Sequence, residues 1–282
     1  MNGPWKDGSC ASLLLLAVSV LHLMAPRVGT TQETAEQSSG VPEFDGIRTL
    51  VCSYAKSKVY ELDAHGDVIW EARVPYAWGC VGLPSGHRVV ASYSGKYIAE
   101  FDADGKEIWR SQSLPGAPFS VQRLENGNTL VPCSDSGKVV EISPEKEIVW
   151  EIELEGRPMD AQRLKNGRTL IALQKLGKVV EVNAEGDVVW EVNGHRGAVA
   201  ASRLENGNTL ICQQGDNKVV EVDAKGTVVW SQAELRNPYD VQRLPNRNTL
   251  IVDYLGVREF NQKGELVWQH ASQGVSRVCR HW

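Results

Sequence analysis

The sequence predicts an all-β fold, a six-bladed β-propeller with four antiparallel strands per blade. Six tryptophans recur along the 282-residue chain at spacings of 39, 41, 40, 40 and 38 residues, by subtraction of their positions. Each closes a near-copy of one phrase, and a period of about 40 residues is typical of folds in which neighbouring copies bury each other's faces. Short apolar runs with no long helical pattern between them favour the blades of a propeller. The six are Trp70, Trp109, Trp150, Trp190, Trp230 and Trp268.

The first element of the chain lies outside the repeats. Residues 11–25 are mostly apolar, follow Lys6, and precede a polar stretch at 30–40. This layout predicts a signal peptide or an N-terminal anchor over 1–30, a polar linker over 31–44 and the propeller over 45–282. We therefore expect a secreted, periplasmic or cell-envelope protein, with membrane contact only if the N-terminal segment is uncleaved.

The copy that begins at residue 203 shows how one blade is built. RLENGNTLI (203–211) contains a strand end, a turn and a second strand; KVVEVD (218–223) and TVVW (227–230) are the next two strands. Their Val, Ile and Leu content, bounded by Asn, Gly and Asp, predicts strands and turns. Gly and Asn tolerate the positive φ of tight hairpins. Such turns recur at 126–128, 166–168, 206–208 and 246–248, and again at 63–67, 102–106, 183–187, 223–227 and 261–265.

The two ends of the repeat region predict how the ring closes. The first copy starts at IRTLV (47–51), which aligns with the second strand of the other copies. The last stretch, GVSRVCR (274–280), aligns with the innermost strand in NPYDVQR (237–243). We expect the C-terminal strand to complete the first blade, which would remove an exposed sheet edge.

Composition excludes several classes of function. The net charge is −5 and the basic residues are not clustered, so nucleic acid is not expected as a partner. The cysteine and histidine spacings do not match a zinc site, and no metal is predicted. A disulfide between Cys52 and Cys279 is conceivable, but small buried thiols in close-packed strands are the favoured interpretation.

The copies differ mainly on one side of the predicted disc. The turns between second and third strands, and the links between blades, vary in sequence and should lie on the same face, which we call the divergent face. Functional residues usually lie on loops held by a rigid scaffold, so we expect binding on this face. The turns are 53–57, 92–95, 133–137, 173–177, 213–217 and 253–256, and the links are 71–79, 110–120, 151–160, 191–200, 231–240 and 269–277.

Candidate binding residues lie where the inner strands begin. Aromatic walls with a few polar groups are typical of a small-molecule site, so a ligand pocket at the channel mouth is one interpretation. The other is that the aromatics plug the channel and that the two aspartates and the arginine form a structural ion pair. The ligand-binding candidates are Trp78, Phe119, Met159, Asp160, Tyr239, Asp240 and Arg277, with Tyr54, Tyr93 and Tyr254 from the neighbouring turns.

Two residue patterns carry a resemblance to known families. DAKGTVVW (223–230) and NAEGDVVW (183–190) resemble the repeats of pyrroloquinoline-quinone-type propellers. DVQRLPNRNTLI (240–251) and DAQRLKNGRTLI (160–171) are similar to the repeats of six-bladed arylsulfotransferase-type propellers. The resemblance covers residues 45–282 and implies a propeller.

The same resemblance implies sulfuryl transfer only if a histidine precedes the inner-strand aspartate. Met159 and Tyr239 occupy those positions, so the transfer chemistry lacks its agent. The quinone ligands cannot be matched residue by residue, and no cofactor is expected. His195 in GHRG (194–197) and Arg277 are weak catalytic candidates; no catalytic residue is assigned.

The sequence therefore predicts a non-catalytic exported propeller that binds a small molecule, a glycan or a protein on the divergent face. One alternative is an arylsulfotransferase-like or quinoprotein-like enzyme with relocated active-site groups. Another is an assembly scaffold similar to the assembly propellers of bacterial envelopes. An open aromatic pocket would favour the ligand binder, whereas a plugged channel with an apolar rim would favour the scaffold.

Overall fold

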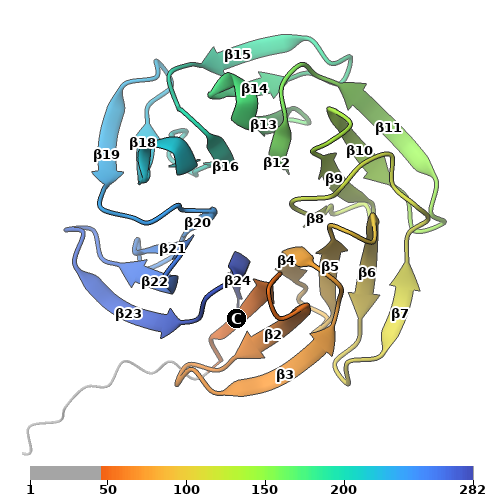
Figure 1. The fold of residues 1–282 in the computed structure, drawn as a ribbon. Coiled ribbons are helices and arrows are strands. Elements are labelled where there is room, and N and C mark those ends of the chain that lie inside the picture. The colour runs from red at the N-terminus through yellow and green to blue at the C-terminus, as the bar shows by residue number, and fades with distance from the viewer. Residues whose placement is uncertain (1–45, 282) are drawn as a thin grey trace, which may run out of the picture. The chain divides into compact units, whose positions relative to one another are not determined.

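The repeat region folds as a six-bladed β-propeller. The computed structural model describes residues 46–281, so the predicted N-terminal segment (1–30) and the linker (31–44) fall outside the described residues. Six four-stranded antiparallel sheets surround a common axis, as Figure 1 shows. The predicted fold class is confirmed. Within the described part, no helix is both long and apolar enough to cross a membrane.

Blades 1 to 3 each run outward from an inner strand near the axis. Blade 1 contains β24 (Val275–His281), β1 (Arg48–Ser53), β2 (Lys58–Leu62) and β3 (Val68–Arg73). Blade 2 contains β4 (Ala77–Gly82), β5 (Arg88–Ser92), β6 (Tyr97–Phe101) and β7 (Glu107–Arg110). Blade 3 contains β8 (Gln122–Arg123), β9 (Thr129–Cys133), β10 (Lys138–Ile142) and β11 (Ile148–Glu153).

Blades 4 to 6 follow the same order. Blade 4 contains β12 (Pro158–Arg163), β13 (Thr169–Leu173), β14 (Lys178–Val182) and β15 (Val188–Val192). Blade 5 contains β16 (Ala198–Arg203), β17 (Thr209–Gln213), β18 (Lys218–Val222) and β19 (Val228–Gln232). Blade 6 contains β20 (Asp240–Arg243), β21 (Thr249–Asp253), β22 (Gly256–Phe260) and β23 (Leu266–Ala271). Two short 3₁₀ turns, η1 (Gln174–Leu176) and η2 (Gln214–Asp216), connect second to third strands in blades 4 and 5.

The C-terminal strand closes the ring as the sequence predicts. β24 pairs antiparallel with β1, with Leu50 opposite Cys279 and Cys52 opposite Arg277. Blade 1 is thus assembled from both ends of the repeat region. All five cysteines among the described residues are unpaired and four of them are buried, which agrees with the interpretation as packed thiols.

A repeated glutamate on the third strand of each blade joins neighbouring blades. One carboxylate oxygen can accept a hydrogen bond from the turn of its own blade, as Asn208 Nδ2 donates to Glu221 Oε1 over 2.7 Å. The other accepts from an arginine of the next blade, as Arg243 Nη2 donates to Glu221 Oε2 over 2.8 Å. The glutamates are Glu61, Glu100, Glu141, Glu181, Glu221 and Glu259, and their arginine partners in the same order are Arg88, Arg123, Arg163, Arg203, Arg243 and Arg280.

The same arginines stack on the tryptophans that close the repeats. Each guanidinium lies over the tryptophan of the preceding blade, at 4.5 to 5.8 Å from the ring centroid, where a cation–π attraction adds to the ion pair. Blade 2 departs from the pattern, because Gly82 occupies the usual arginine position in β4 and Arg88 in β5 supplies the guanidinium. The tryptophans therefore have an inter-blade packing role.

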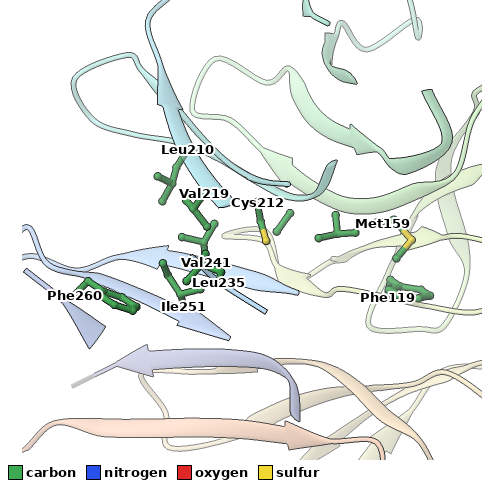
Figure 2. Packing of buried hydrophobic residues seen from close by; sticks show 11 residues of the cluster. Phe119, Met159, Leu210, Cys212, Val219, Leu235, Val241, Ile251 and Phe260 are labelled. Atoms are coloured by element: carbon green, nitrogen blue, oxygen red, sulfur yellow. The ribbon is translucent and has the colours of Figure 1, made fainter. Parts of the chain in front are cut away.

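Apolar side chains fill the space between adjacent blades. Figure 2 shows one such cluster, in which Leu210, Cys212 and Val219 of blade 5 face Val241 and Ile251 of blade 6. All five are buried. Apolar burial of this kind supplies the main favourable free energy of the fold.

Candidate functional site

The axial end of the divergent face is built where the six inner strands begin. Trp78, Met159 and Val199 each lie at a register shift between the first and second strands of their blades. Gly79 shows how tightly the strands approach, because a Cβ on it would lie 2.8 Å from the Cα of Ser120 in the next blade. Gly79 therefore has no room for a side chain.

Arg277 crosses the channel at the deeper level. Its Nη1 donates to Asp240 Oδ1 over 2.7 Å and lies 3.3 Å from Asp160 Oδ2. Its Nη2 donates to the carbonyl oxygens of Met159 and Val199, each over 3.1 Å. The side chain of Arg277 is only 7% exposed. One guanidinium from blade 1 thus joins blades 4, 5 and 6, and Arg277 forms ion pairs with Asp160 and Asp240, as one of the two interpretations of the sequence expects.

Both aspartates also accept hydrogen bonds from the backbone of the following blade. Asp160 Oδ2 accepts from Ala201 N over 3.1 Å, and Asp240 Oδ2 accepts from Val278 N over 2.9 Å. The carboxylates therefore bridge adjacent inner strands as well as binding Arg277. Buried groups of this kind need every partner, because an unpaired charge in the interior is costly.

Two carboxyl groups share the single guanidinium, and this affects the pKa of one of them. Burial raises the pKa of Asp240 from 3.8 to about 6; Arg277 opposes the shift, and the charge of Asp160 adds to it. The two aspartates raise the pKa of Arg277, which keeps its charge. The net charge of the Asp160–Asp240–Arg277 cluster is therefore closer to zero at mildly acidic pH than at pH 8.

Asp240→Asn is expected to gain stability relative to the parent protein as the pH rises. A carboxyl whose folded pKa is raised stabilises the fold fully below pH about 4, and that contribution is lost as the pH approaches about 6. The amide does not titrate. The free energy of unfolding of Asp240→Asn, relative to that of the parent protein, should therefore rise by about 3 kcal/mol across this window. Denaturant unfolding of both proteins at pH 3.5, 5 and 7.5 measures it. A difference that stays constant between pH 5 and pH 7.5 would show that Asp240 is ionised throughout that range.

Five aromatic rings from blades 1, 2, 3 and 6 pack together where the inner strands begin. Trp78 is central: its ring centroid lies 4.6 Å from that of Phe119, 5.1 Å from Tyr54, 5.7 Å from Tyr93 and 6.1 Å from Tyr239. Tyr93 and Phe119 meet edge to face at 5.3 Å. Phe119 is buried and the other four are partly exposed. The predicted aromatic residues of the mouth thus pack on one another and present their outer edges to solvent.

Two predicted residues lie away from this cluster. Tyr254 is 53% exposed, and among the described residues no aromatic contact joins it to the other rings. His195 is buried beneath the divergent face, where Gln213 Nε2 lies 2.8 Å from its Nδ1. Burial lowers the pKa of His195, and the positive charge of Lys218 lowers it further. Both catalytic candidates, His195 and Arg277, are therefore buried and engaged in contacts within the fold.

Sequence reasoning missed further residues of this face. Tyr76, in the link before β4, is 49% exposed and its ring lies 6.5 Å from that of Tyr54. Arg157 lies over Phe119, 5.3 Å from the ring centroid, and donates to Gln174 Oε1 over 3.3 Å. Tyr76 is recognisable as an aromatic in a divergent link, whereas nothing in the spacing indicates the contact of Arg157. Across residues 46–281, no cluster of three or more His, Cys, Asp or Glu side chains could hold a metal ion.

Solved structures similar to this chain include several propellers. A Bacteroides caccae protein of unknown function aligns with a TM-score of 0.72 and 17% identity over 83% of this chain and 98% of that one. Virginiamycin B lyase from Staphylococcus aureus gives 0.62 and 11% identity over 80% and 82%. The WD40 β-propeller domain of Doa1 gives 0.64 and 13% over 81% and 80%. At these identities the likeness establishes the fold alone.

Sequence comparison identifies the family. No curated protein matches the chain. A family model described as outer membrane protein assembly factor BamB matches residues 20–164, 94–245 and 136–278, which together span most of the chain and all six blades. The match agrees with the repeat phrases that resemble pyrroloquinoline-quinone-type propellers. The chain therefore belongs to this family of PQQ-like repeat propellers.

Proposed function

We propose that the protein is an exported, non-catalytic scaffold that binds a protein partner on its divergent face. The observation that carries the proposal is the filled axis: Arg277 occupies the deeper level and the aromatic cluster around Trp78 occupies the mouth. A filled axis favours contact over a surface rather than capture of a ligand in a channel. The family's name, which describes an assembly factor of the outer membrane, supports a binding role in the cell envelope.

Exposed apolar side chains around the mouth support a protein as the partner. Tyr76 enters from the link before blade 2, Leu176 from η1 of blade 4, and Tyr254 and Leu255 from the turn of blade 6; each is 40–53% exposed. Aromatic residues with partly exposed rings are favoured at protein interfaces, because a rigid ring buries much area at little entropic cost. Together with the aromatic cluster, they distribute apolar contacts over three sides of the face.

The enzymatic alternative has less support, because its candidate groups serve the fold. The guanidinium of Arg277 binds two carboxylates and two carbonyl groups, and His195 is buried against Gln213. A small-molecule or glycan ligand remains the competing occupant of the mouth. Thermal-shift measurements with aryl sulfates, quinones and oligosaccharides test for such a ligand. A ligand at the mouth should raise the melting temperature of the parent protein, and Trp78→Ala should abolish this rise.

Site-specific photo-crosslinking tests the proposed function. Benzoylphenylalanine placed at Tyr254 or Tyr76 should cross-link the same protein in cells of the source organism, because both side chains lie on one face. The matched control position is Lys225, an exposed residue in a turn on the opposite face. Cross-linking to one partner from both test positions and not from Lys225 is expected. Equal cross-linking from all three positions, or none from the divergent face, would contradict the proposal.

A further inference from the structure

A groove separates blades 4 and 5 on the divergent face, outside the aromatic cluster. Its lining residues come from η1, with Lys175 and Leu176, and from η2, with Asp216, which we call its walls, and from Gly194, Arg196 and Gly197 of the link before β16, which we call its floor. The groove has a volume of about 440 Å³, within the usual range for binding sites in proteins. No motif or spacing in the sequence indicates it.

The floor of the groove is held rigidly by backbone hydrogen bonds to both walls. His195 N donates to Gly177 O over 2.8 Å, Gln214 N donates to Gly197 O over 3.0 Å, and Gly215 N donates to Arg196 O over 3.1 Å. A Cβ on Gly197 would lie 2.7 Å from Gly215 N, so the link and η2 approach too closely for a side chain there. The groove is therefore formed before any ligand binds, which lowers the entropic cost of binding.

His195 anchors this floor from below. Besides its backbone bond to Gly177 at the end of η1, its ring lies 2.8 Å from Gln213 Nε2, at the end of β17. The lowered pKa of His195 favours the neutral ring at physiological pH. A neutral, buried histidine adds no charge to the groove, so the charge there comes from the residues above it.

The charged lining residues are Lys175, Arg196 and Asp216, two positive charges against one negative, which gives the groove a net charge of +1. The Arg196 side chain is 79% exposed and lies 3.8 Å from Asp216 Oδ1, near the limit for an ion pair. Among residues 46–281, Lys175 and Arg157 form no salt bridge, whereas the arginine of each blade interface is paired with a glutamate. Arg157 connects the groove to the aromatic cluster through Gln174, which in turn donates to Gln214 over 3.0 Å.

We propose that this groove binds an extended acidic segment of a protein partner, with carboxylates on Arg196 and Lys175 and an apolar side chain on Leu176. The charges complement such a segment, and Leu176 is 46% exposed at the wall. The inference deepens the proposed function and rests on it, because it names the partner's chemistry at one part of the divergent face. Contact with the groove would hold the same partner beside the aromatic cluster.

Peptide binding tests the groove directly on the full-length protein. The probe is fluorescein-labelled (Glu-Leu)₄, compared by anisotropy with (Gln-Leu)₄ at low ionic strength. We expect the acidic peptide to bind tighter, and the Arg196→Glu/Lys175→Glu variant to weaken it by roughly tenfold, because two attractive exposed charges become repulsive. The control Lys225→Glu carries the same kind of charge reversal on the opposite face and should leave the affinity within about twofold. Salt at 0.5 M should weaken binding to the parent protein, since exposed charges are screened.

The outcomes separate this inference from the proposed function. Equal affinity for both peptides, or unchanged affinity in Arg196→Glu/Lys175→Glu, overturns the acidic groove. The milder single variant Arg196→Gln, with a thermal melt to confirm folding, should weaken binding in the same direction. If a partner cross-links from Tyr254 and Tyr76 while the acidic peptide does not bind, the proposed function stands and the groove inference fails. If the peptide binds but no partner cross-links, the groove stands and the proposed scaffold role fails.

Discussion

Arg277→Met is expected to lower the free energy of unfolding by roughly 3–5 kcal/mol, the cost of removing one partner from a buried ion pair. The methionine fills much of the same space but leaves Asp160 and Asp240, and the carbonyls of Met159 and Val199, without their donor. Denaturant unfolding at pH 7.5, followed by tryptophan fluorescence, measures the change.

The position of the arginine, rather than the loss of an arginine as such, should account for this effect. Arg196→Met removes a guanidinium from the surface and should change the free energy of unfolding by no more than about 0.5 kcal/mol. The loss in Arg277→Met should also be smaller at pH 5, because the pKa of Asp240 is raised to about 6 and its protonation removes an unpaired charge. Equal effects of the two substitutions would show that the axial ion pair contributes nothing to stability.

Adding Asp160→Asn and Asp240→Asn to Arg277→Met is expected to recover part of the lost stability. The amides remove the two uncompensated charges and still accept hydrogen bonds from Ala201 N and Val278 N. The comparison separates the cost of unpaired charge from the loss of packing around Arg277. Failure of the triple variant to exceed Arg277→Met in stability would attribute the whole loss to packing.

Deleting β24, by ending the chain after residue 274, should abolish the cooperative unfolding transition. The deletion exposes the edge of β1 and removes Arg277 from the axis and Arg280 from its contacts with Glu259 and Trp268. Because the last interface of the ring is lost together with the axial ion pair, the effect should exceed that of any single substitution. Thermal unfolding followed by circular dichroism and near-ultraviolet tryptophan signals detects it.

A synthetic peptide of residues 272–282 provides the control for this deletion. Added in trans, it should restore the near-ultraviolet signal, because β24 pairs with β1 through register contacts that need no covalent link. A peptide with Arg277→Ala should restore less, and a scrambled peptide should restore nothing. A shortened chain that melts within a few degrees of the full protein would show that closure by β24 is dispensable.

The sequence predicts the architecture well because the information for it is local and repeated. The spacing of the tryptophans counts the blades, the Asn-Gly-Asn phrases mark the hairpins, and the alignment of 274–280 with 237–243 predicts the closing strand; the structure confirms all three. The hairpins and strands depend on residues within one repeat, where turn geometry and strand alternation act over a few positions, and the closing strand is recognised because it repeats the same phrase. The inter-blade glutamate and arginine also recur at equivalent positions of the repeats, but only the structure shows that they form ion pairs between blades.

By contrast, the contents of the axis and the groove depend on residues from different repeats. The sequence placed Asp160, Asp240 and Arg277 at one level but left open whether they form a pocket or a plug. The answer depends on tertiary packing, because Arg277 donates hydrogen bonds to Asp240 and Met159, which are 37 and 118 positions away in the sequence. The groove beside Arg196 likewise arises from how a link packs under two turns.

The sequence by itself determined the blades, through short-range hydrogen bonding and period-two burial, and it indicated their closure, because the last stretch repeats the inner strand that the first copy lacks. Only the tertiary structure decided which side chains meet at the axis and on the divergent face, because side-chain reach and burial there depend on all six blades at once.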